Sequence, residues 1–117
     1  IREALSEGTC VIGLIDVPPT QAEKGRYPVQ LFGRPASLPI GLLQLAATER
    51  VAIAAFVMTV NWNTGRRRLD ICSLQSTTPE KQLAEIAALL DKEILRQPEA
   101  WHIWLCAPSF LSTTSPD

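Results

Sequence analysis

Asp16 is the acidic residue in the best position for chemistry in this chain of 117 residues. It directly follows a continuous apolar run at residues 9–15 and precedes a proline-rich stretch, so a buried strand is predicted to end at this carboxylate. Helix-covered sheets place ligands and catalytic groups at such strand ends. Asp16 therefore either supports a site or accepts hydrogen bonds from backbone N–H groups of the loop, as Asp often does.

Two further places carry positive charge beside a predicted turn. Phe32-Gly33-Arg34 is a tight loop whose arginine can contact a phosphate, although the same residues also fit a plain turn that ends a strand. Residues 66–68 are all arginine and follow a predicted hairpin turn. They are either solvated residues of an edge strand or a short basic cluster that attracts an anionic lipid surface.

His102 is the only histidine, and its neighbours favour a packed, hydrogen-bonded side chain over a catalytic base. No Asp or Glu lies within the five residues after it, so it cannot open a His-x4-Asp pair. The sequence also lacks a P-loop, a GxGxxG loop, a GxSxG elbow and an HExxH motif. Common catalytic motifs therefore give no function by themselves.

Composition excludes several classes of protein. An apolar fraction of 46% is too high for an intrinsically disordered chain, and a formal charge of −1 excludes a strongly basic nucleic-acid binder. The longest uncharged apolar stretch, residues 51–60, is about half the length that a helix needs to cross a bilayer. Cys10, Cys72 and Cys106 are widely spaced without a CxxC pair, which predicts reduced, packed thiols in a cytosolic or cytosol-facing protein.

The hydrophobic pattern predicts alternating helices and strands. Residues 1–7 are expected to be the last turns of a helix, ended by Gly8 in a left-handed conformation. Residues 9–15 are predicted to be a strand buried on both faces, and residues 17–28 a loop. The next predicted elements are a short strand at 29–32, a helix at 40–50 with Pro39 at its first position, a central strand at 51–60, a turn at 63–65 and a hairpin strand at 66–74.

The strongest helix signal lies in the last third of the chain. Either Thr77, in a capping box with Glu80, or Thr78 before Pro79 is expected to cap it, and Pro98 to end it. A short, bulky buried segment is predicted at 101–105 and a disordered polar tail at 112–117. The order of elements predicts an α/β fold, a mixed β-sheet covered by helices. The apolar stripe of the long helix consists of Leu83, Ile86, Ala87, Leu90 and Ile94.

Three stretches match a known pattern in collinear order: LSEGTCVIGLID (5–16), VQLFGRPASLPIGLLQLAATERVAIAAFVM (29–58) and QPEAWHIWL (97–105). They resemble the C-terminal half of the lysophospholipid acyltransferase superfamily, in particular the bacterial lipid A biosynthesis (lauroyl/myristoyl) acyltransferases. The matching residues are Gly8, Val11 and Asp16; Leu31-Phe32-Gly33; residues 35–37; Leu45-Ala46; and Pro98-Glu99-Ala100-Trp101 with Trp104.

The resemblance implies transfer of a fatty acyl group from an acyl carrier protein or coenzyme A thioester to a lipid hydroxyl. Enzymes of this superfamily use a His-x4-Asp/Glu pair in which the histidine deprotonates the hydroxyl and the acid orients it. That pair lies upstream of the matched region. By resemblance, residues 1–111 are the C-terminal portion of an acyltransferase-like domain whose N-terminal half is absent, and this segment alone is expected to be inactive.

The resemblance also assigns residues and partners. Asp16 corresponds to a functionally sensitive acid in a supporting catalytic role, and Phe32, Gly33 and Arg34 are expected to bind substrate along an acyl or acceptor groove. No metal, bound cofactor or nucleic acid is expected. The expected partners are the acyl donor, the lipid acceptor and a membrane surface, at the cytoplasmic face of the bacterial inner membrane or in the cytoplasm. The alternatives are a non-catalytic acyltransferase-like module that binds lipid or a partner, and a soluble hydrolase-like fragment.

Overall fold

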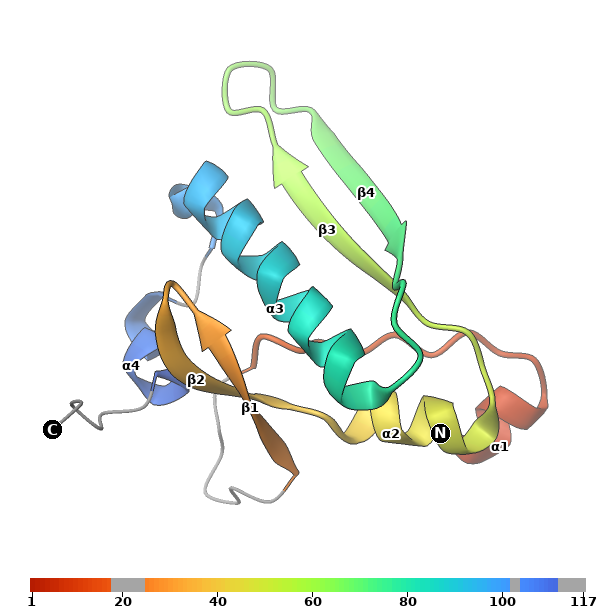
Figure 1. Ribbon diagram of the computed structural model, residues 1–117. Coiled ribbons are helices and arrows are strands. Elements are labelled where there is room, and N and C mark those ends of the chain that lie inside the picture. The colour runs from red at the N-terminus through yellow and green to blue at the C-terminus, as the bar shows by residue number, and fades with distance from the viewer. Residues whose placement is uncertain (18–24, 102–103, 112–117) are drawn as a thin grey trace, which may run out of the picture.

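The computed structural model describes residues 1–17, 25–101 and 104–111, which form a small α/β domain (Figure 1). His102 and the predicted tail at 112–117 lie outside these residues. Within the described residues, both sheets are antiparallel pairs, so the prediction of one mixed sheet is wrong. The elements are α1 (Arg2–Ser6), β1 (Arg26–Leu31), β2 (Arg34–Pro39), α2 (Gly41–Glu49), β3 (Ala54–Val60), β4 (Arg67–Ser73), α3 (Pro79–Arg96), η1 (Pro98–Ala100), η2 (Trp104–Cys106) and α4 (Ala107–Phe110).

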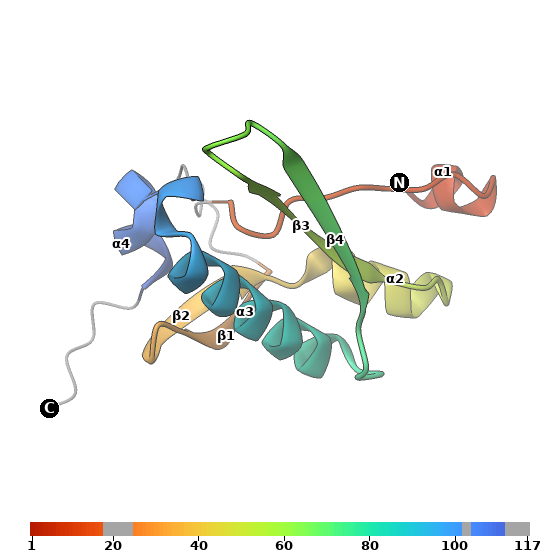
Figure 2. The same ribbon diagram turned by 90° about the horizontal axis from the view of Figure 1, so that it is seen from above.

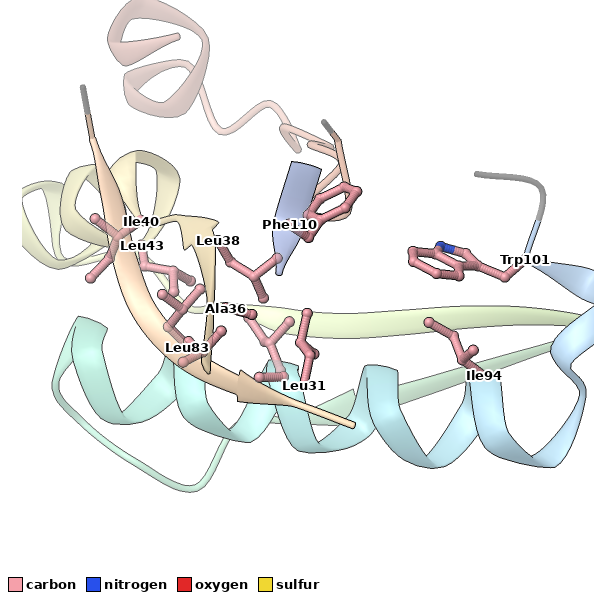
Figure 3. Close-up of a cluster of buried hydrophobic side chains, with 12 residues drawn as sticks. Leu31, Ala36, Leu38, Ile40, Leu43, Leu83, Ile94, Trp101 and Phe110 are labelled. Carbon is pink, nitrogen blue, oxygen red and sulfur yellow. The ribbon is translucent and has the colours of Figure 1, made fainter. Parts of the chain in front are cut away.

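The long helix α3 organises the core, as its apolar stripe predicts. Leu83, Ala87 and Ile94 are buried, and the β1–β2 hairpin packs on the same side of the helix. Figure 3 shows this cluster between the hairpin and α3, with Trp101 and Ile94 at its far end. The buried side chains that complete the cluster are Val29, Leu31, Ala36, Leu38, Ile40, Leu43, Ile86 and Phe110.

The start of α3 is fixed by an N-cap residue and by hydrogen bonds from the preceding backbone to a side chain of the helix. Thr78 is the N-cap and Pro79 occupies the first turn, so the second of the two predicted caps is confirmed. The carboxylate of Glu85 accepts hydrogen bonds from the backbone N–H groups of Ser76 (2.6 Å) and Gln75 (2.8 Å). Hydrogen bonding favours the ionised carboxylate and lowers the pKa of Glu85: the side chain of Ser76 has the largest effect, followed by the backbone N–H of Gln75.

The apolar run at residues 9–15 is not the predicted buried strand. Ile12 and Leu14 are 72% and 68% exposed, and the segment follows α1 in irregular conformation across α2, where Gly13 approaches the side chain of Leu42. A strand needs a neighbour that satisfies its backbone N–H and C=O groups, and no described strand pairs with this run. Cys10 lies in this unpaired run and is exposed, so the prediction that its thiol is packed is wrong.

A hairpin of β1 and β2 replaces the single short strand predicted at 29–32. Arg26 and Tyr27 lie in β1 rather than in the loop predicted at 17–28, and Pro39 ends β2 rather than opening the next helix. The backbone N–H of Ile40 donates to the carbonyl of Gly25 (2.9 Å), which extends the hairpin pairing to the helix N-cap. Because Arg26 and Pro39 are register partners, the proline sits at the open end of the hairpin, where sheets tolerate it.

The predicted second hairpin is confirmed, but its first strand is not central. β3 and β4 pair in register around a turn in which Gly65 has a φ of 69°. Figure 2 shows this pair extending away from α3 and the first hairpin. Ala55 on its inner side packs against the core, although its register partner Cys72 on β4 is exposed. Phe56 and Ile71 on the other side are exposed. The hairpin therefore forms a separate two-stranded ribbon with one uncovered side.

Candidate functional site

Asp16 and Trp101 are 85 residues apart in sequence and joined by a hydrogen bond. The indole Nε1–H of Trp101 donates to Oδ2 of Asp16 over 3.2 Å. Trp101 is buried after η1, and Asp16 is half-buried in a bend that follows the irregular N-terminal run. Asp16 thus ends the apolar run as predicted, although a bend rather than a strand end positions its carboxylate.

Trp101 is the centre of an aromatic cluster that consists of Phe32, Trp101, Trp104 and Phe110. The ring of Trp101 lies edge-on to Trp104 at 4.7 Å between centroids, and its centroid is 6.2 Å from Phe32 and 6.1 Å from Phe110. Phe32 and Trp104 are stacked at 6.0 Å. Trp104 is 42% exposed, so one side of the aromatic cluster is open to solvent.

The Phe32-Gly33 turn holds its phenylalanine in an unfavourable backbone conformation. Both residues have positive φ, 54° and 68°, as the two central positions of a type I′ hairpin turn require. Asn-Gly is the preferred pair in this turn, and a left-handed conformation costs a bulky residue about 1–2 kcal/mol. The backbone N–H of Phe32 donates to Oδ1 of Asp91 on α3 over 2.9 Å, which holds the turn against the helix. Phe32 therefore makes this turn less stable than Asn would at the same position.

Arg34, the third residue predicted in this loop, does not join the aromatic cluster. It begins β2 opposite Leu31 and is exposed. Within the described part of the chain its side chain makes neither a hydrogen bond nor an ion pair. Arg34 is therefore free to contact an anionic group from solvent at the edge of the turn.

Arg26 is a cation beside the aromatic cluster that the sequence did not reveal. Its guanidinium carbon lies 5.7 Å from the centroid of Phe110, and its Nε–H donates to Oγ of Ser37 over 3.0 Å. Desolvation by burial lowers the pKa of Arg26. The alternation of Tyr27, Val29 and Leu31 is the signal that could have extended the strand back to this arginine.

Phe32→Asn tests whether the strained turn serves the site rather than the fold. Asn relieves the left-handed strain but loses the half-buried ring, so the two effects offset and the free energy of unfolding is expected to change by less than about 1 kcal/mol. Leu31→Ala, one residue away and fully buried, is expected to lower it by about 2–5 kcal/mol. Urea denaturation measures both. A loss for Phe32→Asn as large as that for Leu31→Ala would make Phe32 a core residue.

The described residues give further findings on metals and membranes. Among residues 1–17, 25–101 and 104–111, no three His, Cys, Asp or Glu side chains gather in a way that could hold a metal ion. In the same residues, no helix combines the length and the apolar character needed to cross a membrane. No protein-family profile, curated protein or solved structure matches this chain.

Proposed function

We propose that this chain is part of an acyltransferase that moves a fatty acyl group from an acyl carrier protein or coenzyme A thioester to a lipid hydroxyl, of the lipid A or lysophospholipid type. One observation carries the proposal. Asp16, the Phe32-Gly33 turn and the Trp101–Trp104 region belong to three different stretches that resemble the superfamily, and they meet in one place. A phenylalanine in a left-handed turn costs stability, which supports a role for Phe32 beyond packing of the core.

The proposed reaction needs a base that accepts the proton of the acceptor hydroxyl. The hydroxyl oxygen attacks the thioester carbonyl carbon, the new C–O bond forms, and the C–S bond breaks. The base then returns its proton to the departing thiolate. The base in this proposal is the histidine of a His-x4-Asp/Glu pair upstream of Ile1, in the N-terminal half of the same acyltransferase-like domain.

The residues of this chain bind and position the reactants. The aromatic cluster offers an apolar surface for an acyl chain at its solvent-open side, beside Phe32 and Trp104. Asp16 is a positioning residue, because its carboxylate fixes the indole of Trp101. Arg34 begins the strand that follows the turn and supplies positive charge toward a phosphate or carboxylate of the substrates, whereas Arg26 lies at the open end of the hairpin beside Phe110.

A transfer assay with a lauroyl or myristoyl thioester and a lipid acceptor tests this proposal. The full-length protein is expected to transfer the acyl group, whereas the 117-residue segment alone is expected to give no rate above background, because it lacks the base. Acceptor-dependent turnover by the segment would show that the base is not upstream. No transfer by the full-length protein, with any acyl length from about eight to eighteen carbons, would contradict the enzyme assignment.

A non-catalytic module that binds lipid or a protein partner is the second candidate. The uncovered side chains Ile12 and Leu14, and those of the second hairpin, favour it because they are contact surface without a catalytic group. The upstream sequence separates the two candidates. A His-x4-Asp/Glu pair there supports the enzyme, and its absence supports the module.

A further inference from the structure

The outer face of the second hairpin is unusually apolar for a solvated surface. Phe56 and Met58 on β3 face Ile71 and Leu69 on β4 as register partners, and all four are exposed, between 43% and 67%. Because alternate residues of a strand share one side, these four side chains form a single surface, here called the hairpin face. Contiguous exposed apolar surface of this kind marks an interaction site.

The tip of the same hairpin carries positive charge and a tryptophan. Arg67 pairs with Val60, which places it on the same side as the hairpin face. Arg66 precedes it, and both are exposed. Trp62 in the turn is 60% exposed. Arg68, on the other side, pairs with Asp70 (2.8 Å), so Arg67 supplies the positive charge on the side of the hairpin face, and Arg66 adds an exposed charge beside it at the tip.

The turn that presents these side chains is well ordered by its own hydrogen bonds. The backbone N–H of Asn61 donates to the carbonyl of Arg66 (2.8 Å), and that of Gly65 donates to the carbonyl of Asn61 (2.7 Å). Oδ1 of Asn61 also accepts from the N–H groups of Asn63 and Thr64. The tip is therefore preorganised, and binding would cost little loop entropy.

We propose that the hairpin face and its tip dock on an anionic lipid bilayer. The apolar side chains enter the interfacial region, Trp62 lies at the level of the headgroups, and Arg66 and Arg67 contact lipid phosphates. The hairpin lies along the surface and does not span the bilayer, because a two-stranded ribbon leaves backbone groups on both edges that hydrocarbon cannot satisfy.

Charge favours lipid over a second copy of the chain. Two copies meeting through this face would bring their Arg66 and Arg67 side chains toward like charges, whereas an anionic bilayer neutralises them. The inference rests on the proposed function in that a lipid acceptor places the enzyme at a bilayer. The inference adds to the proposed function the surface of the protein that contacts the bilayer.

Vesicle co-sedimentation of the protein, without acyl donor, tests the proposal. Binding to vesicles of phosphatidylglycerol and phosphatidylcholine is expected to exceed binding to phosphatidylcholine alone. Each basic residue near an anionic surface strengthens binding about five-fold, so the double variant R66Q/R67Q is expected to bind about 25-fold more weakly. The matched double variant K81Q/K92Q, which removes the same charge from exposed positions on α3, is expected to bind as the unchanged protein does.

Tryptophan fluorescence with brominated lipids locates the contact. Quenching of the unchanged protein is expected, and Trp62→Phe is expected to remove most of it. Equal binding to both vesicle types, equal loss in K81Q/K92Q, or a dimer that forms through this face without lipid would overturn the proposal. Transfer to a detergent-dispersed acceptor separates the two claims, since it persists if only the docking surface is wrong and is absent if the proposed function is wrong.

Discussion

Asp16→Asn in the full-length protein is expected to lower acyl transfer by about a hundred-fold, the effect of misplacing a reacting group by about 1 Å. Asn keeps an oxygen that can accept the indole N–H of Trp101, so the fold is expected to remain intact. The negative charge is lost, and with it the stronger, charge-assisted bond that fixes the ring. Steady-state kinetics and thermal unfolding of the same preparation separate the two effects.

Asp70→Asn is the matched control for this substitution. Asp70 also has one polar partner, Arg68, but it lies on β4 and makes no contact with the aromatic cluster among the described residues. Its transfer rate to a detergent-dispersed acceptor is expected to stay within about two-fold of the unchanged protein. Unaltered kinetics for Asp16→Asn would reduce Asp16 to a structural hydrogen-bond acceptor.

Trp101→Ala is expected to lower the free energy of unfolding by about 3–5 kcal/mol, the largest stability effect in the region of the site. The indole is buried, contacts three other rings and is the donor to Asp16. Its removal leaves a cavity at the end of the core. We expect that α3 and the first hairpin cannot move close enough to each other to fill this cavity. Urea denaturation at neutral pH measures the loss.

Trp104→Ala provides the comparison, because Trp104 has the same side chain in the same cluster but is 42% exposed. Its truncation removes less buried surface and is expected to cost less than half as much. Similar losses for the two variants would mean that Trp101 is no more central to packing than its exposed neighbour.

The elements that the sequence predicted well are those with a local cause. The stripe and cap of α3, the turn around Gly65 and the left-handed Gly8, with a φ of 75°, depend on residues close together in the chain. The prediction of a strand at 9–15 was wrong because the apolar, β-branched composition of this run indicates only a preference for burial. Whether it forms a strand depends on a partner strand elsewhere in sequence, which composition does not encode.

The site was predicted in part. Asp16, Phe32 and Gly33 were identified, and their meeting with Trp101 follows from tertiary packing across about 85 residues, which no local pattern specifies. The predicted buried segment at 101–105 holds for Trp101 but not for Leu105, which is 96% exposed. Arg26 was missed because three prolines in the residues around it favoured a loop.

A double-mutant cycle tests most directly whether the three segments form one site. Asp16→Asn, Phe32→Asn and the combined variant of the full-length protein are compared by kcat/KM for acyl transfer. Since Trp101 bridges the two side chains, their effects are expected to be coupled by about 0.5–3 kcal/mol. Effects that add to within about 0.3 kcal/mol would show that the carboxylate and the strained turn act independently, and would contradict a shared site.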